Sequence, residues 1–307
     1  MLIGSIDVNE FAVIDTIASA LGDSATAPWI RVGIGDDAAV MRARDGFDQV
    51  ASIDTLVADV HFPTNAPPEL IGYRALMVSL SDLAAMAAVP RYALVALTLP
   101  EVGGATCQQW VQRLASGMAV AAQQTNTALC GGNLSRGPLA ISVSVHGEVE
   151  AGQARLRSTA AAGERVYVSG PLGSAAACVR TNQLLPVTAD ALTAQQHAYY
   201  RPAARFDCRA DILAATSAID ISDGLLQDLA HVLEASGCGA ELHAHDIPLG
   251  PGAELADALA GGDDYQLLFS SARLPATGIC IGKLTHEPGI RLDGKDIPAD
   301  GYQHFSA

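Results

Sequence analysis

Four segments of this chain place aspartate beside glycine or at the end of an apolar run. They are residues 33–37, 52–55, 220–224 and 261–265. A polar turn directly after an apolar run ends a strand, and in α/β folds ligands bind beside such strand ends. Carboxylates gathered there suit Mg²⁺, which binds through a few carboxylates and the oxygens of a phosphate. The pattern predicts a fold of strands and helices with a magnesium-dependent site for phosphates.

Strands and helices alternate in both halves of the chain. The spacing of apolar residues predicts helices at 10–21, 67–88, 105–124, from 174 and from 225, and strands at 50–54, 92–99, 141–145, 165–169 and 218–221. A polar stretch rich in Ala and Gly, residues 148–163, separates the halves. A chain of 307 residues is long enough for two domains. We expect an α/β (α+β) protein with domains at 1–148 and 149–307.

The predicted helix at 67–88 is apolar on nearly every side, and a helix of this kind is buried. Asp82 lies within it. Because a buried carboxylate needs a partner or a metal ion, Asp82 is either a metal ligand or a cap for a neighbouring loop.

The excess of acidic residues excludes some classes of binding partner. Asp and Glu total 33 against 18 Lys and Arg, which gives a formal net charge of −15. Such a surface repels nucleic acid and anionic membranes, so we expect neither as a partner. It also repels ATP unless cations lie between them, which again requires a metal ion.

The six cysteines are scattered and form no Cys-x-x-Cys pair. This spacing argues against a zinc site and against a disulfide framework. Residues 1–11 contain acids and no basic start, unlike a secretory signal, and the charge-free run 114–135 has a polar interruption unlike a membrane span. We expect a soluble, cytoplasmic protein.

Common phosphate-binding motifs are absent from the sequence. The chain has two lysines, Lys283 and Lys295, and neither follows the glycine pattern of a P-loop. The His-Arg-Asp and Asp-Phe-Gly motifs of protein kinases do not occur either. The turn at 33–35 lacks the third glycine of a dinucleotide site, and residues 220–224 depart from EF-hand spacing. A phosphate site here therefore depends on aspartate clusters and bound cations.

Six short segments, taken in order, resemble one family. They are residues 33–40, 54–62, 133–139, 168–173, 219–225 and 261–269. Together they are similar to the thiamine-monophosphate kinases, within the superfamily of aminoimidazole ribonucleotide synthetase and selenophosphate synthetase. The resemblance implies a two-domain fold like that of aminoimidazole ribonucleotide synthetase, with a C-terminal α/β domain and a homodimer built on N-terminal strands. It also implies an ATP-using enzyme that makes thiamine diphosphate from thiamine monophosphate by direct in-line transfer, assisted by several Mg²⁺ ions.

The resemblance assigns roles to individual residues of this sequence. The implied metal-binding residues are Asp37, Ser52, Ile53, Asp54, Asp82, Asn133, Asp220 and Asp223. The implied ATP contacts are Gly132, Asn133, Arg157 and Ser222, and the implied contacts to thiamine monophosphate are His61, Asp263 and Tyr302. No general base is expected, because the acceptor phosphate is already ionised at neutral pH.

Four of these positions depart from the family pattern. Ile53 can offer only its backbone carbonyl, and Asn133 stands where many relatives carry Asp. Asp263 replaces a Glu, and Tyr302 replaces a Trp yet keeps a ring that can stack on a heteroaromatic. Tyr302 could instead be a tail residue that covers the core.

Two other functions remain open at this point. One is a different ATP-using synthetase of the same superfamily, and the other is a non-catalytic relative that binds metal only. Residues 1–30 lack the Cys and Lys that a selenophosphate synthetase would need. The departures at Ile53 and Asp263, together with Ala88 at a position where relatives often have Gly, keep the non-catalytic alternative open.

The expected dimer also has a physical argument. Residues 93–99 and the alternating Ile141, Val143 and Val145 give apolar sheet faces. We expect one small domain to leave part of these faces uncovered, and a second copy would bury them.

Overall fold

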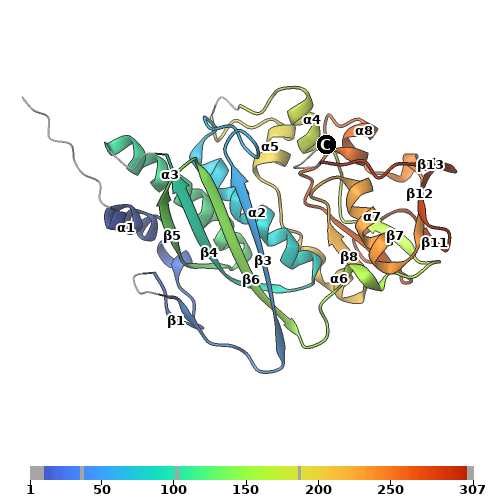
Figure 1. The fold of residues 1–307 in the computed structure, drawn as a ribbon, viewed down its shortest axis with the longest axis horizontal. Coiled ribbons are helices and arrows are strands. Elements are labelled where there is room, and N and C mark those ends of the chain that lie inside the picture. Colours follow the sequence, from blue (N-terminus) through green and yellow to red (C-terminus); the bar gives the residue numbers. More distant parts are fainter. Residues whose placement is uncertain (1–9, 35–37, 101–103, 186–187, 303–307) are drawn as a thin grey trace, which may run out of the picture. The chain divides into compact units, whose positions relative to one another are not determined.

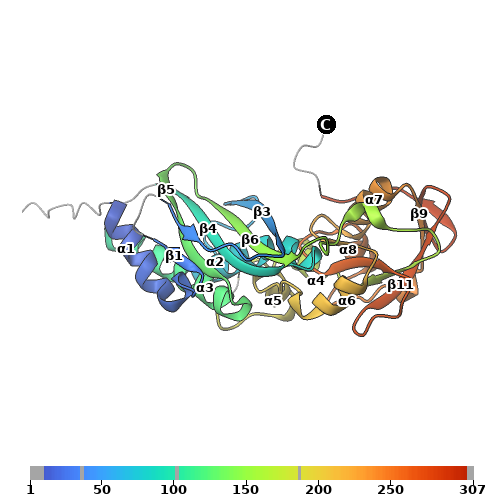
Figure 2. The same cartoon turned by 90° about the horizontal axis from the view of Figure 1, so that it is seen from below.

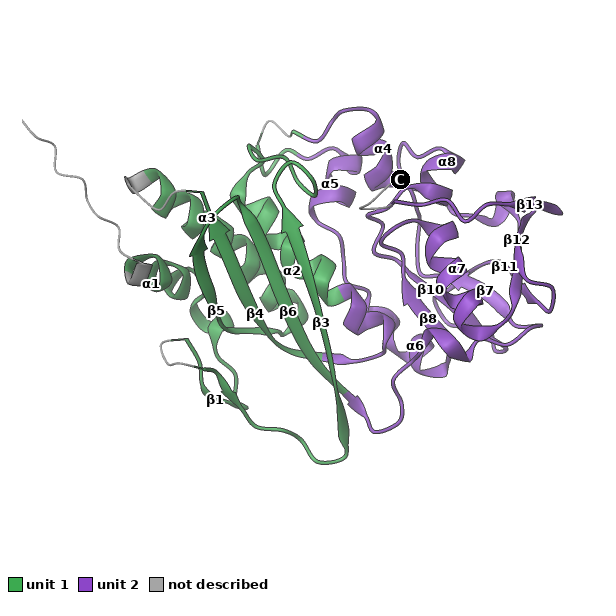
Figure 3. Ribbon diagram, in the orientation of Figure 1, with its two compact units in different colours: residues 1–80, 90–148, 185–191 green, residues 81–89, 149–184, 192–307 purple. Residues whose placement is uncertain are grey.

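The computed structural model describes residues 10–34, 38–100, 104–185 and 188–302 (Figure 1). Asp37 lies outside the described residues. Contacts divide the chain into two compact units (Figure 3). Unit 1 comprises 1–80, 90–148 and 185–191, and unit 2 comprises 81–89, 149–184 and 192–307. The predicted domain boundary between residues 148 and 149 differs from these units, because it is a prediction of which segments fold independently. It stays a prediction.

Unit 1 is built on a four-stranded sheet. Its strands, in spatial order, are β3 (Phe47–Val57), β6 (Ala140–Glu150), β4 (Val89–Leu99) and β5 (Ala128–Arg136). Strands β4 and β5 are parallel and are connected by α3 (Gly104–Thr125). A short antiparallel pair, β1 (Ile30–Val32) and β2 (Val40–Met41), precedes β3. Helix α1 (Glu10–Leu21), continued by the 3₁₀ turn η1 (Gly22–Ala25), packs on α3.

Helices α2 (Pro68–Ala85) and α3 lie on one side of this sheet (Figure 2). The two helices touch through glycine: a Cβ on Gly72 would lie 2.1 Å from the Leu114 carbonyl oxygen, and one on Gly117 would lie 1.9 Å from that of Glu69. Helix α2 is buried along nearly its whole length, which confirms the expectation from its all-round apolar sequence. Asp82 is half-buried near its end.

The physical argument for a dimer is wrong, because the apolar face of the sheet is already covered. Ile141, Val143 and Val145 are fully buried within the chain itself, so they need no second copy. Alternate residues of β6 face the opposite side, where Ser142 bonds to Thr55 of β3 through their hydroxyls at 2.7 Å. We call this opposite side the open face of the sheet.

Unit 2 contains a seven-stranded sheet. Its spatial order is β13 (Lys295–Ile297), β12 (Gly289–Leu292), β9 (Gly239–Leu242), β11 (Ile279–Thr285), β7 (Arg165–Val168), β10 (Leu267–Ser271) and β8 (Ser217–Asp220). β12 and β9 are parallel, whereas the other neighbours are antiparallel. The mixed helix-and-strand architecture agrees with the predicted α/β (α+β) class.

Short helices surround this sheet. They are α4 (Ser174–Arg180), α5 (Ala194–Tyr200), α6 (Arg209–Ala214), α7 (Leu225–Ser236) and α8 (Leu255–Ala260), with 3₁₀ turns η2 (Arg157–Thr159), η3 (Phe206–Cys208) and η4 (Ala244–Asp246). The main core of unit 2 packs α7 against the sheet, and a second apolar cluster joins α6 to the last turn of α2. In the part of the chain that is described, no helix combines the length and hydropathy needed to cross a membrane.

Candidate active site

The end of β8 and the start of β10 lie side by side, since Asp220 pairs with Leu267 across the antiparallel sheet. The aspartate turn after β8 and the Gly-Gly-Asp-Asp-Tyr segment before β10 therefore meet at one sheet edge. Asp220 is only 5% exposed, at the last position of its strand. Two of the four segments singled out in the sequence are thus brought together in unit 2.

Residues 221–224, which we call the β8–α7 loop, are held by a residue that sequence reasoning missed. Oδ2 of Asp228, in the first turn of α7, accepts the backbone N–H groups of Ser222, Asp223 and Gly224 at 2.9, 3.0 and 3.2 Å. Burial raises the pKa of Asp228 to about 6, and the charge of Asp223 adds to the rise while the backbone hydrogen bonds oppose it. The available signal was an acid on the apolar face of a predicted helix.

The carbonyl groups of the β8–α7 loop face the other way and bind two distant segments. The pairs are Ile221 with the N–H of Tyr265 at 2.8 Å, Ser222 with that of Asp263 at 2.9 Å, and Asp223 with that of Tyr302 at 2.9 Å. The predicted ATP and metal residues Ser222 and Asp223 are therefore bonded directly to the predicted acceptor residues Asp263 and Tyr302.

The Gly-Gly-Asp-Asp-Tyr segment carries backbone strain. Asp263 and Tyr265 have φ of 71° and 50°, which non-glycine residues rarely adopt, and such strain is concentrated at functional sites. The Tyr265 hydroxyl donates to Asp263 Oδ1 at 3.0 Å, which orients this carboxylate. The neighbouring Asp264 accepts the N–H of Gly173 at 2.7 Å, and burial raises its pKa well above the usual value.

Tyr302 is fixed by its backbone, while its side chain is 45% exposed. Gln227 reinforces the arrangement, because its Nε2 donates to Asp223 Oδ2 at 2.9 Å and to the Tyr302 carbonyl at 3.0 Å. This exposure leaves part of Tyr302 at the surface.

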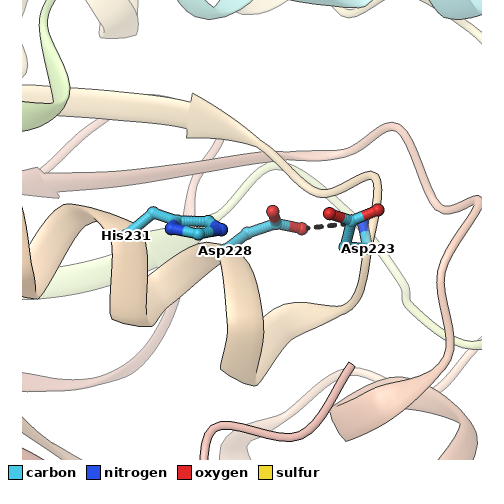
Figure 4. Close-up of side chains that lie close together, drawn as sticks. All are labelled: Asp223, Asp228 and His231. Carbon is cyan, nitrogen blue, oxygen red and sulfur yellow. Dashed lines mark hydrogen bonds between the residues drawn. The ribbon is translucent and has the colours of Figure 1, made fainter. Parts of the chain in front are cut away.

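The carboxylates of this edge fit a divalent cation by their chemistry. Ligand atoms of Asp223, Asp228 and His231 lie within 4.8 Å of one another, and Figure 4 shows Asp228 between the other two. Asp223 and Asp228 supply the oxygen atoms that Mg²⁺ prefers, although Oδ2 of Asp228 already accepts three backbone N–H groups.

In unit 1 the predicted residues lie on two separate edge strands. Ser52, Ile53 and Asp54 are in β3, and Gly132 and Asn133 are in β5, with β6 and β4 between them. Neighbouring strands lie about 4.8 Å apart, so these edges are separated by roughly 14 Å.

The two edges also present opposite faces of the sheet. Asn133 pairs with Ala96 on the open face, whereas Asp54 alternates with the open-face residues Ile53 and Thr55 and points to the helix side. Within one chain, Asp54 and Asn133 are therefore too far apart to bind the same ion.

Two further predicted residues have defined surroundings. His61 follows β3, and its Nδ1 accepts the N–H of Val57 at 3.0 Å, so the neutral ring carries its proton on Nε2. The carbonyl of Arg157 accepts the hydroxyl of Ser236 at 2.8 Å, at the end of α7 opposite the β8–α7 loop. Because α7 has 12 residues and spans about 18 Å, Arg157 does not lie beside Ser222 in one chain.

Residues 35–149 match the model for the N-terminal domain of AIR synthase related protein. This match places the N-terminal part of the chain in the class of AIR synthase related proteins. The chain is 36% identical to thiamine-monophosphate kinase of Salmonella typhimurium, with 90% of this chain and 93% of that protein covered. It belongs to the thiamine-monophosphate kinase family, which confirms the resemblance of the six motifs.

Solved structures agree with this assignment. Thiamine-monophosphate kinase of Stenotrophomonas maltophilia K279a superposes with a TM-score of 0.83 at 35% identity, covering 94% of this chain and 98% of that one. AaThiL, solved in complex with AMPPCP and TMP, superposes with a TM-score of 0.78 at 30% identity, covering 99% of this chain and 100% of that one.

Proposed function

We propose that the protein transfers the γ-phosphate of ATP to thiamine monophosphate and releases thiamine diphosphate and ADP. The observation that carries this proposal is the β8–α7 loop, which bonds the predicted nucleotide residues to Asp263 and Tyr302 through its backbone. A donor and an acceptor of phosphate would thus be held by one rigid segment. Family membership and the ligands of AaThiL, AMPPCP and TMP, support the choice of substrates.

Phosphoryl transfer depends on positioning and on charge neutralisation more than on covalent catalysis. Mg²⁺ supplies this neutralisation when bound to the phosphates. Asp54, Asp82, Asp220 and Asp223 would hold Mg²⁺ ions, with Asp37, Ser52 and Asn133 as further candidates. Ile53 would contribute only its carbonyl, since its hydrocarbon side chain has no ligand atom. The acceptor phosphate is ionised at neutral pH, so the residues need only bind and orient it.

The acceptor residues have separate tasks. The Asp263 carboxylate, oriented by Tyr265, would contact thiamine monophosphate, and the partly exposed Tyr302 ring would stack on one of its rings. His61 would donate from Nε2 to the acceptor phosphate, because its Nδ1 already accepts the backbone N–H of Val57.

We also propose that the protein is a homodimer through the open face of unit 1. A site that uses both Asp54 and Asn133 needs them from two copies, because one chain keeps them on opposite edges and faces of its sheet, and only Asn133 lies on the open face. The open face offers a surface for this contact: Ile53 is 66% exposed, and Tyr92 stacks on His146 with ring centroids 4.5 Å apart. Light scattering should give a dimer mass for the wild type, a monomer for Ser144→Arg on this face, and a dimer for Gln112→Arg on α3.

Product analysis tests the activity directly. The protein incubated with ATP, Mg²⁺ and thiamine monophosphate should form thiamine diphosphate, and chelation of Mg²⁺ should stop it. Asp220→Asn should abolish turnover while the fold is retained, and Asp246→Asn in η4 serves as the matched control. Phosphorylation of an aminoimidazole ribonucleotide precursor in place of thiamine monophosphate would assign the chain to another activity of its superfamily. Binding of Mg²⁺ and ATP without any turnover would identify a non-catalytic relative.

A further inference from the structure

Asp228 has an unusual set of contacts for a surface-helix acid. Its side chain is almost fully buried, and one carboxylate oxygen accepts three consecutive backbone N–H groups, those of residues 222–224. Hydrogen bonds to an ionised acceptor are about twice as strong as neutral ones. Without this carboxylate, three N–H groups in a partly buried loop would lose their partner, and the loop would have to rearrange to regain hydrogen bonds.

The loop that Asp228 holds has no freedom to rearrange without moving its neighbours. Its carbonyl oxygens bind the N–H groups of Tyr265, Asp263 and Tyr302. Gly224 has a φ of 124°, and a Cβ there would lie 2.9 Å from the carbonyl carbon of Ala260, so α8 fixes the loop on a further side. A displacement of the loop would therefore reach both the nucleotide residues and the acceptor residues.

We propose that Asp228 is a positioning residue for both substrates. It contacts neither substrate, and it acts by fixing the β8–α7 loop. Ser222 and Asp223 of this loop face the nucleotide, and its carbonyl oxygens accept the backbone N–H groups of Asp263 and Tyr302. The kinetic consequences of this role rest on the proposed function. Its structural consequences rest on the hydrogen bonds alone. Because Oδ2 is already saturated with three N–H groups, this oxygen is a poor candidate for a metal ligand.

Two substitutions and one matched control test the role. Asp228→Ala removes the acceptor, and Asp228→Asn retains one neutral acceptor oxygen. Asp211 is the control, because its carboxylate on α6 accepts the N–H groups of Ala276 and Thr277 at 2.8 and 2.9 Å and so anchors a loop without predicted site residues. All proteins are compared well below their melting temperatures, so that only folded molecules are measured.

The expected kinetic result is a joint loss. A misplacement of about 1 Å can cost about 100-fold in rate, so we expect kcat/KM for ATP and for thiamine monophosphate to fall together by about that factor in Asp228→Ala. Asp228→Asn should rescue part of this loss, and Asp211→Ala should lower the melting temperature but change both constants less than twofold. Unchanged constants in Asp228→Ala, or a loss confined to one substrate, would overturn the proposal.

Hydrogen exchange gives a second readout that needs no turnover. The amides of residues 222–224 should be protected in the wild-type protein and should exchange measurably faster in Asp228→Asn, whose neutral oxygen is a weaker acceptor, while the amides in the middle of α7 stay protected. Free exchange of these amides in the wild type would disprove the anchoring role. This result stands even if the wild-type protein proves inactive, an outcome that would contradict only the proposed function. It also decides the matter if Asp228→Ala does not fold.

Discussion

Replacing Gly132 with alanine should push strand β5 away from β4. A Cβ on Gly132 would lie 1.9 Å from the carbonyl oxygen of Val95 and 2.8 Å from its carbonyl carbon. Carbon and oxygen in contact lie about 3.3 Å apart, so the two strands must separate locally by about 1.4 Å. Since both clashing atoms belong to backbone, no rotamer change can relieve the contact.

The neighbouring Gly131 provides a matched control. A Cβ there would meet a side-chain methyl group of Leu94 at 3.0 Å, which a small rotation can move. Overpacking costs about 1–3 kcal/mol, and we expect the upper end for Gly132→Ala and less than about 1 kcal/mol for Gly131→Ala. Urea denaturation of the two variants and the wild type measures this difference in the free energy of unfolding.

The same substitution tests the proposed nucleotide contact. Gly132→Ala moves Asn133 as well, so calorimetry should show a loss of affinity for AMPPCP with Mg²⁺, whereas Gly131→Ala should retain it. If Gly132→Ala is as stable as Gly131→Ala, the close approach of β5 to β4 is wrong. If it is destabilised yet binds AMPPCP normally, β5 does not belong to the nucleotide site.

Three further outcomes are expected. Asp263→Ala should raise KM for thiamine monophosphate while calorimetry shows AMPPCP binding within a few-fold of wild type; loss of AMPPCP would place Asp263 on the wrong substrate. Burial raises the pKa of Asp264, so its stabilising contribution is present below its unfolded pKa and is lost as the pH rises through the folded value. The stability of Asp264→Asn relative to wild type should therefore increase from about pH 4 to about pH 8 in urea titrations, and a constant difference would refute this. Burial raises the pKa of Cys130 and Cys178 to about 11, so alkylation near neutral pH should label the half-exposed Cys280 before either, as read by mass spectrometry.

The sequence predicted the elements that bury a continuous apolar pattern. The helix expected at 67–88 is α2, and the strand expected at 218–221 is β8, with α7 ending before Gly237 at its left-handed φ of 69°. The strands of unit 2 after α7 were not predicted. The three-residue β13 pairs only with its neighbour β12, whereas β9 and β12, of four residues each, pair with each other although they lie far apart in the sequence. Local pattern carries no information on such pairing.

The candidate site was predictable by residue type but not by arrangement. The aspartate turns identified Asp220 and Asp223, yet their bonds to Asp263 and Tyr302 join residues far apart in the sequence. Asp228 escaped notice because an acid in the first turn of a helix is usually a solvated favourable charge at the helix N-terminus. Its place on the apolar face of α7 was the available signal, and the packing of α7 shows that this carboxylate points inward.

Helix α2 has a consequence for how the chain emerges from the ribosome. Its residues up to Leu80 belong to unit 1, whereas its last turn, with Ala84 and Ala85, packs in unit 2 against Tyr167, Ile212 and Phe269. The partners of that turn are synthesised long after the helix itself. A nascent chain that has completed the strands of unit 1 therefore carries an uncovered apolar helix end until the second half follows, and a fragment that stops near residue 148 would keep it permanently.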